Sequence, residues 1–143
     1  RMDTNHEQVL YRQEAYKIVG CAIEVLKELG PGLLEKPYEN ALVVEFQKQG
    51  VPYAQQQSYP IIYKGVQVGE HIPDLIAYGK IVVDTKCVDT ITPEHRAVML
   101  SYLRLTSCRL GLYLNFKRSK LEVLVKASWP VLVLMVAQGW LVV

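Results

Sequence analysis

The sequence predicts an α/β fold in which helices flank a mixed β-sheet. Three observations support this prediction. Apolar residues recur at helical spacing near the N-terminus, β-rich runs separated by turn residues fill the middle, and a further helix precedes an apolar strand. The chain has 143 residues, of which 50% are hydrophobic and 21% charged, so it can bury a core. We expect one domain over residues 1–126 and an apolar C-terminal tail over residues 127–143.

Two helices are expected before the β-rich part of the chain. Residues 6–29 carry apolar side chains at helical spacing, and the Gly-Pro-Gly of residues 30–32 then interrupts the helix. A second helix is expected over residues 34–49. Gly50 is suited to end it, because glycine readily adopts the left-handed conformation found after a helix.

Three strands are expected in the middle of the chain, over residues 53–63, 66–77 and 80–88. Lys64-Gly65 is a turn signal between the first two. The last two form a hairpin whose turn lies around Gly79.

A third helix and one further strand complete the expected sheet. Thr92 is a candidate N-cap and Pro93 suits the first helical position, so we expect a helix that runs to about Leu105. Residues 110–116 form an apolar strand, and residues 121–125 are a candidate for another. The resulting order of elements favours a mixed sheet covered on both faces.

The hairpin brings two acidic residues together. If its loop is centred on Gly79, Asp74 lies opposite Asp84, and Lys86 shares a face with Asp84. Carboxylates directly opposite one another repel, so we expect a cation between them, either Lys86 or a divalent metal ion. The alternative is that Asp74 is an ordinary turn residue after Pro73, and that Asp84 and Lys86 form a surface ion pair.

Two motifs carry a resemblance to a known family. The Pro-Asp of residues 73–74, followed by the Asp-Thr-Lys of residues 84–86, resembles the motif of the PD-(D/E)XK nuclease superfamily. Residues 32–38 (Gly-Leu-Leu-Glu-Lys-Pro-Tyr) match the signature that names the GxxExxY protein family, a branch of that superfamily. The likeness extends over about residues 18–116.

The resemblance implies a core of helix, three-stranded meander, helix and strand, here with an extra N-terminal helix. It also implies that Asp74, Asp84 and Glu35 bind one or two Mg²⁺ or Mn²⁺ ions, cations that prefer carboxylate oxygens. Lys86 would orient or activate the attacking water, or help to neutralise the transition state. The implied catalytic residues are Asp74, Asp84, Lys86 and Glu35.

Glu35 and Tyr38 also have structural interpretations. A glutamate in the first turn of a helix is favoured by the helix dipole, which alone could explain Glu35. Glu39 lies one turn later on the same face and could substitute or assist. We interpret Tyr38 as core packing rather than as a catalytic residue.

Two positions depart from the family pattern. Val98 occupies the place, four residues before Tyr102, where relatives commonly carry a glutamine that supports the metal site or contacts the substrate. Its absence puts catalytic competence in question. Asp84 stands where the family more often has glutamate, a change that keeps the carboxylate but shortens its reach.

The expected function is metal-dependent hydrolysis of phosphodiester bonds in DNA, in preference to RNA, by a cytoplasmic protein without a membrane anchor. Some relatives of this fold work as dimers, so a homodimer is also considered. The net charge of +2 is too small to predict a general nucleic-acid coat protein. A basic rim is still conceivable from six residues: Arg104, Arg109, Lys117, Arg118, Lys120 and Lys126.

Two other functions remain open. One is a nucleic-acid-binding or regulatory module that keeps the fold but has lost turnover. The other is a protein-interaction subunit that docks through the apolar residues 128–143.

Overall fold

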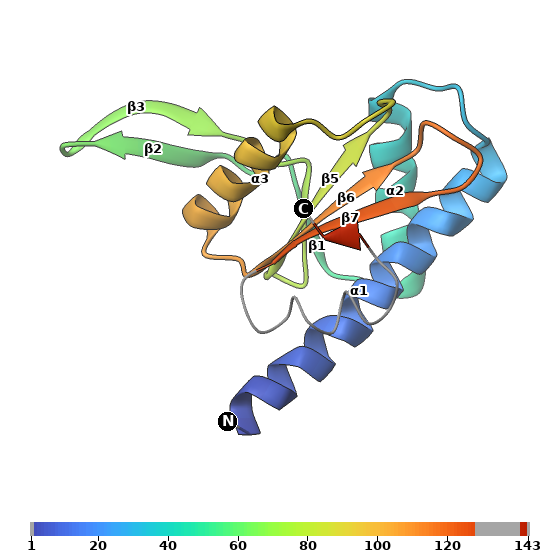
Figure 1. Cartoon of the computed structure of the whole chain (residues 1–143), viewed down its shortest axis with the longest axis horizontal. Helices are drawn as coiled ribbons and strands as arrows, with labels where there is room; N and C mark the ends of the chain where they lie inside the picture. The colour runs from blue at the N-terminus through green and yellow to red at the C-terminus, as the bar shows by residue number, and fades with distance from the viewer. Residues whose placement is uncertain (1, 128–140, 143) are drawn as a thin grey trace.

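A computed structural model describes residues 2–127 and 141–142 (Figure 1). Within these residues, six strands form a mixed sheet of order β1-β4-β5-β6-β7-β8, and β2 pairs with β3 in a separate two-stranded sheet. The elements in chain order are α1 (Met2–Leu29), α2 (Glu35–Gln49), β1 (Tyr53–Gln55), β2 (Tyr59–Tyr63), β3 (Val66–His71), β4 (Leu75–Ala77), β5 (Ile81–Lys86), α3 (Pro93–Thr106), β6 (Leu110–Asn115), β7 (Glu122–Ala127) and β8 (Leu141–Val142). The predicted α/β class is confirmed.

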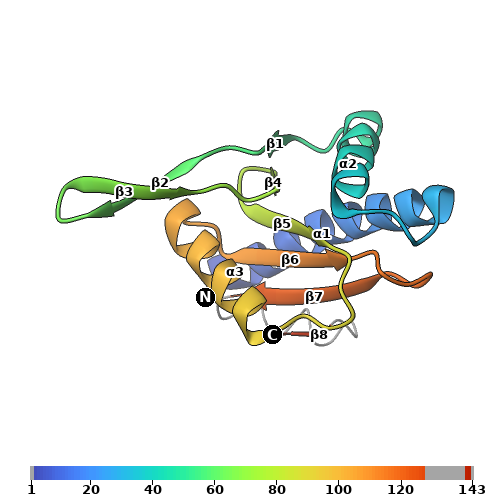
Figure 2. The same ribbon diagram turned by 90° about the horizontal axis from the view of Figure 1, so that it is seen from above.

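Helices cover both faces of the larger sheet, as predicted. Figure 2 shows α1 and α2 on one side of the sheet and α3 on the other. Alternation along β5 divides its side chains between the two layers. Ile81 and Val83 join the core cluster formed with α1 and α2, whereas Val82 joins the cluster beneath α3. Side chains of β5 that share the face of Val82 therefore point toward α3.

The predicted helix ends are confirmed by their caps. Gly50 ends α2 in the left-handed conformation, with φ of 73°, and its N–H donates to the carbonyl of Phe46. At the start of α3, the hydroxyl of Thr92 accepts a hydrogen bond from the N–H of His95, and Nδ1 of His95 accepts one from the N–H of Thr92. Pro93 occupies the first helical position, where its missing N–H costs nothing.

The long strands expected over residues 53–63 and 66–77 are each broken in two, so this part of the prediction is wrong. Gln56 has a left-handed φ of 56°, and its N–H donates to the carbonyl of Asp74 at 2.9 Å. Pro73 has no N–H with which to continue the ladder. The two breaks thus lie side by side, the β2–β3 hairpin projects from the body (Figures 1 and 2), and Asp74 lies at the break.

Most of the predicted tail lies outside the described residues. Residues 141–142 form β8, which pairs in parallel with β7. The expectations for residues 128–140 are not addressed by the described part of the chain. A search of the described helices finds none that is long and apolar enough to cross a membrane.

Candidate active site

The β4–β5 hairpin has the register that the sequence predicts. Leu75 pairs with Val83, and Ile76 pairs with Val82. Continuing this antiparallel register by one position places Asp74 opposite Asp84. The turn is tight because Tyr78 and Gly79 both have positive φ angles, of 57° and 68°.

Asp74, Asp84 and Lys86 form the centre of the site. Nζ of Lys86 lies 3.0 Å from Oδ2 of Asp84, and Asp84 is only 4% exposed. Oδ2 of Asp74 accepts hydrogen bonds from the backbone N–H and the hydroxyl of Thr85, both at 2.9 Å. The ammonium of Lys86 also lies 5.7 Å from the centroid of the Tyr113 ring, on the α3 side of the sheet.

The electrostatics of these groups are strongly perturbed. Burial, together with the neighbouring Asp74 carboxylate, raises the pKa of Asp84 from 3.8 to about 8, although Lys86 acts in the opposite direction. Burial acts to lower the pKa of Lys86, but the carboxylates of Asp84, Glu35 and Asp74 outweigh it and raise that pKa. Lys86 is therefore a cation at neutral pH, and by itself it does not hold Asp84 ionised.

Glu35 reaches this site from the opposite helical layer. It is the first residue of α2, and its Oε2 accepts a hydrogen bond from the backbone N–H of Cys87 at 3.0 Å. Cys87 directly follows Lys86 at the end of β5, and the Glu35 carboxylate acts on the charge of Lys86. The structure thus places Glu35 beside the end of the strand that bears Asp84 and Lys86.

Tyr38 explains how the Gly-Pro-Gly segment and α2 are held in place. Its side chain is fully buried and stacks on the ring of Phe116, with centroids 4.6 Å apart and planes 7° apart. Its hydroxyl donates to the carbonyl of Gly30 and accepts from the N–H of Leu33. The N–H of Phe116 in turn donates to the carbonyl of Lys86 at 2.8 Å. The interpretation of Tyr38 as a core residue is confirmed, and its contacts join the start of α2 to the end of β5.

The donor atoms at the centre fit a divalent cation. Asp74 and Asp84 supply hard carboxylate oxygens, and a divalent cation between them would offset the burial and the charge of Asp74 that raise the pKa of Asp84. Among the residues that the structure describes, no three His, Cys, Asp or Glu side chains are grouped so that they could hold a metal ion. Glu35 is instead engaged with the amide of Cys87.

Helix α3 forms the other wall of the site. Burial, and then the carboxylates of Asp84 and Asp74, raise the pKa of Tyr102 to about 12. Val98 lies one helical turn before Tyr102 and is 39% exposed. The hydroxyl of Tyr113 donates to the carbonyl of His95, which ties the start of α3 to β6. Val98 therefore lies on the stretch of α3 whose Tyr102 senses the charges of Asp74 and Asp84.

Sequence reasoning left a second group of polar residues out of the proposed site residues. The carboxylate of Glu39 is buried on α2 and accepts hydrogen bonds from the side-chain amides of Gln55 and Gln56 and from Lys36. The only sequence signal that points to Glu39 is its position one helical turn after Glu35. The buried polar residues of the described chain are Glu39, Asp84, Thr85 and Asn115. Of these, Asp84 and Thr85 belong to the centre of the site. Glu39 is connected to Asp74 by hydrogen bonds of Gln56.

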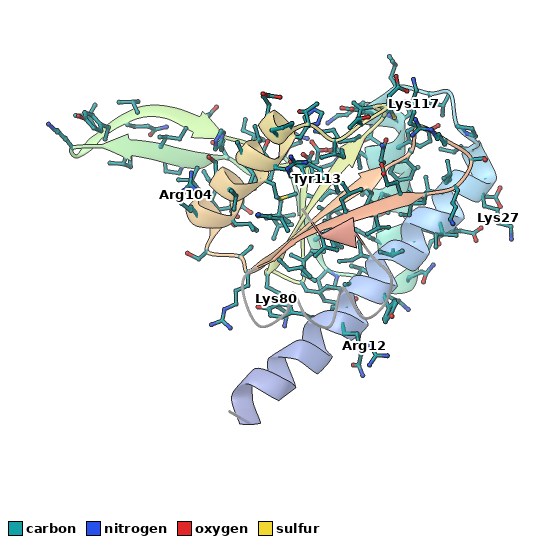
Figure 3. All side chains as sticks on the ribbon, viewed as in Figure 1. Arg12, Lys27, Lys80, Arg104, Tyr113 and Lys117 are labelled. Atoms are coloured by element: carbon teal, nitrogen blue, oxygen red, sulfur yellow. The ribbon has the colours of Figure 1, made fainter. Side chains whose placement is uncertain are left out.

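The basic residues considered as one rim are divided between two ends of the sheet. Lys117 follows the end of β6, and Lys126 pairs with Gly111 near the start of that strand. Figure 3 likewise shows Arg104 and Lys117 far apart. Lys117 and Arg118 each lie within 4 Å of Asp89, at 3.9 and 3.8 Å. Lys117 and Arg118 therefore lie at the same end of the sheet as Lys86, because Lys86 pairs with Asn115 at the end of β6.

Comparison with known proteins identifies the family. The sequence profile described as the PD-(D/E)XK nuclease superfamily matches residues 12–127. The chain therefore belongs to the PD-(D/E)XK nuclease superfamily, whose fold agrees with the one seen here. Nucleases of this superfamily generally use divalent metal ions and act on nucleic acids. Comparisons with curated proteins and with solved structures find no match.

Proposed function

We propose that this protein is a nuclease that hydrolyses phosphodiester bonds in DNA with Mg²⁺ or Mn²⁺ bound at Asp74 and Asp84. The observation that carries the proposal is the buried carboxyl group of Asp84, held beside Asp74 with the ammonium of Lys86 3.0 Å away. When bound, the divalent ion would lower the pKa of a coordinated water and stabilise negative charge on the scissile phosphate. Membership of a nuclease superfamily supports the same reaction.

Lys86 acts in this proposal as a fixed positive charge. Its raised pKa keeps the ammonium protonated, so it serves as a hydrogen-bond donor to the attacking water or to a phosphate oxygen rather than as a general base. The contact with Asp84 and the nearby Tyr113 ring restrict where the ammonium lies. Such a preorganised charge stabilises a transition state without having to reorient during the reaction.

Glu35 is proposed to add a third carboxylate at the edge of this centre. In the structure its Oε2 accepts a hydrogen bond from the backbone N–H of Cys87, which leaves the other carboxylate oxygen as the atom that would face a metal ion. The Gly-x-x-Glu-x-x-Tyr pattern of residues 32–38 supports assignment to the GxxExxY branch of the superfamily.

Cleavage and metal binding by matched variants test this function. Calorimetry with Mn²⁺, followed by incubation with DNA and RNA, is carried out on the parent, Asp84→Asn and Lys86→Met. Asp89→Asn is the control, because Asp89 is an acidic residue near the same edge with a 79% exposed side chain.

We expect Asp84→Asn to lose Mn²⁺ binding and cleavage, and Lys86→Met to lose cleavage while it still binds the ion. The control should match the parent in both measurements. Cleavage at the parental rate by Asp84→Asn and Lys86→Met would exclude this centre as the catalytic site. The same assay separates DNA from RNA as the preferred substrate.

Val98 favours a second candidate, a nucleic-acid-binding module that has lost turnover. An apolar side chain at this place offers no hydrogen bond to a metal-bound water or to the substrate. Binding of DNA with no cleavage in either Mg²⁺ or Mn²⁺ would favour this candidate over the nuclease.

A further inference from the structure

The carboxylate of Glu39 is buried next to the candidate active site without belonging to it. Only 3% of the residue is exposed, a burial that is costly for a charged group unless it is fully hydrogen-bonded. Its Oε2 accepts from Nε2 of Gln55 at 2.8 Å and from Nε2 of Gln56 at 2.9 Å. Nζ of Lys36 adds a contact at 3.2 Å. The carboxylate is therefore a fixed anchor for the two glutamines.

Gln56 connects this anchor to Asp74. Its backbone has φ of 56°, a left-handed conformation that is uncommon for a residue other than glycine. In that conformation its N–H donates to the carbonyl of Asp74 at 2.9 Å. The side-chain amide of the same residue donates to the Glu39 carboxylate, so Gln56 bonds the buried carboxylate through its side chain and the Asp74 carbonyl through its backbone.

Asp74 is thereby held at both ends. Its carbonyl is held by Gln56, and its carboxylate oxygen Oδ2 accepts two hydrogen bonds from Thr85 on β5. Asp74 directly precedes β4, and the bond from Gln56 extends the β1–β4 register by one position to reach it. These contacts hold the backbone of Asp74 against β1 and its carboxylate against β5, on the side of Asp84.

We propose that Glu39, acting through Gln56, is a positioning residue that sets the placement of Asp74 opposite Asp84. The importance of this placement for metal binding rests on the proposed function, whereas the placement itself concerns the folded chain alone. Gln55 provides a matched comparison. It donates to the same Glu39 oxygen and to Asn40, but its backbone pairs regularly with Leu75 and makes no bond to Asp74.

Amide hydrogen exchange on the metal-free protein tests the placement. The backbone N–H of Thr85 donates to the Asp74 carboxylate, so its exchange rate reports whether Asp74 stays in place. We expect Glu39→Ala and Gln56→Ala to raise this rate about 10-fold relative to the amide of Val82 in the same strand. Gln55→Ala and Glu39→Gln, which retains an acceptor oxygen, should stay close to the parent. An unchanged Thr85 rate in Glu39→Ala, or an equal rise in Gln55→Ala, would overturn the proposal.

Mn²⁺ affinity gives the second readout, with melting temperature measured on every variant. Loss of a group that orients a metal ligand typically lowers affinity 10- to 100-fold, so Gln56→Ala should lose at least 10-fold and Glu39→Gln much less. If Glu39→Gln abolishes binding as Asp84→Asn does, Glu39 is itself a ligand and the positioning role is wrong. If the parent does not bind Mn²⁺, the proposed function fails, and the exchange rates still decide the placement.

Discussion

Replacing Asp84 with asparagine tests the electrostatic account of the site in the absence of nucleic acid. Burial and the Asp74 carboxylate raise the pKa of Asp84 from 3.8 to about 8. Between these values the folded chain keeps a proton on Asp84 that the unfolded chain has released. The free energy of unfolding therefore falls as the pH rises from about 4 to about 8, and Asp84→Asn removes this dependence.

The size of the effect follows from the shift in pKa. A difference of about 4 units corresponds to roughly 5–6 kcal/mol, at about 1.4 kcal/mol per unit. Relaxation of Lys86 and Asp74 around the ionised group reduces this figure. A third of it, about 2 kcal/mol, still changes the melting temperature of a chain of this length by about 5 °C.

The assay is thermal unfolding at pH 5, 6, 7 and 8 in the presence of a chelator, for the parent, Asp84→Asn and the exposed control Asp89→Asn. Asp84→Asn should be increasingly more stable than the parent as the pH rises, and the control should follow the parent. Added Mn²⁺ should then raise the melting temperature of the parent at pH 8, but not that of Asp84→Asn. A stability difference between parent and Asp84→Asn that stays constant from pH 5 to pH 8 would refute this reasoning.

Three further predictions concern residues that pack around the candidate site. Val98→Gln should raise kcat/KM for DNA cleavage roughly 10-fold, which is the effect of one added hydrogen bond, and it should leave the melting temperature nearly unchanged. A kcat/KM equal to or below that of the parent would contradict this prediction. Gly111→Ala should destabilise the chain by about 1–3 kcal/mol in urea unfolding, because the added Cβ overlaps the sulfur of Met99, the buried residue of α3. Unaltered stability would show that the Met99 side chain moves aside without cost. Tyr38→Phe should cost about 1–2 kcal/mol, since the N–H of Leu33 and the carbonyl of Gly30 lose their partner, and a neutral result would mean that water replaces the hydroxyl.

Local signals predicted the helices and the hairpin register well. The α3 start depends on Thr92 and Pro93, and the α2 end depends on Gly50, so each boundary is decided within a few residues of sequence. The turn at Gly79 sets the pairing of β4 with β5 in the same way. From this register, strand alternation places Asp84 and Lys86 on one face, as the 3.0 Å contact between them confirms.

Pro73 is a local signal for the break before β4, but the break at Gln56 could not be predicted in this way. The stretch around Gln56 looks like a continuous β-rich run, because the sequence contains no glycine there to suggest a left-handed residue. Gln56 bonds to a backbone group 18 positions away and to a buried carboxylate on α2. Contacts at this separation leave no local pattern in the chain.

The sequence by itself determined which residue types could do the chemistry and which of them share a strand face, because turn and cap residues act over a few positions. The tertiary structure decided how those residues behave. Packing of α3 over the sheet buries Asp84 and raises its pKa, and the stack of Tyr38 on Phe116 brings Glu35 to the end of β5. Burial and the meeting of distant segments depend on how whole layers pack, which no local pattern of residues encodes.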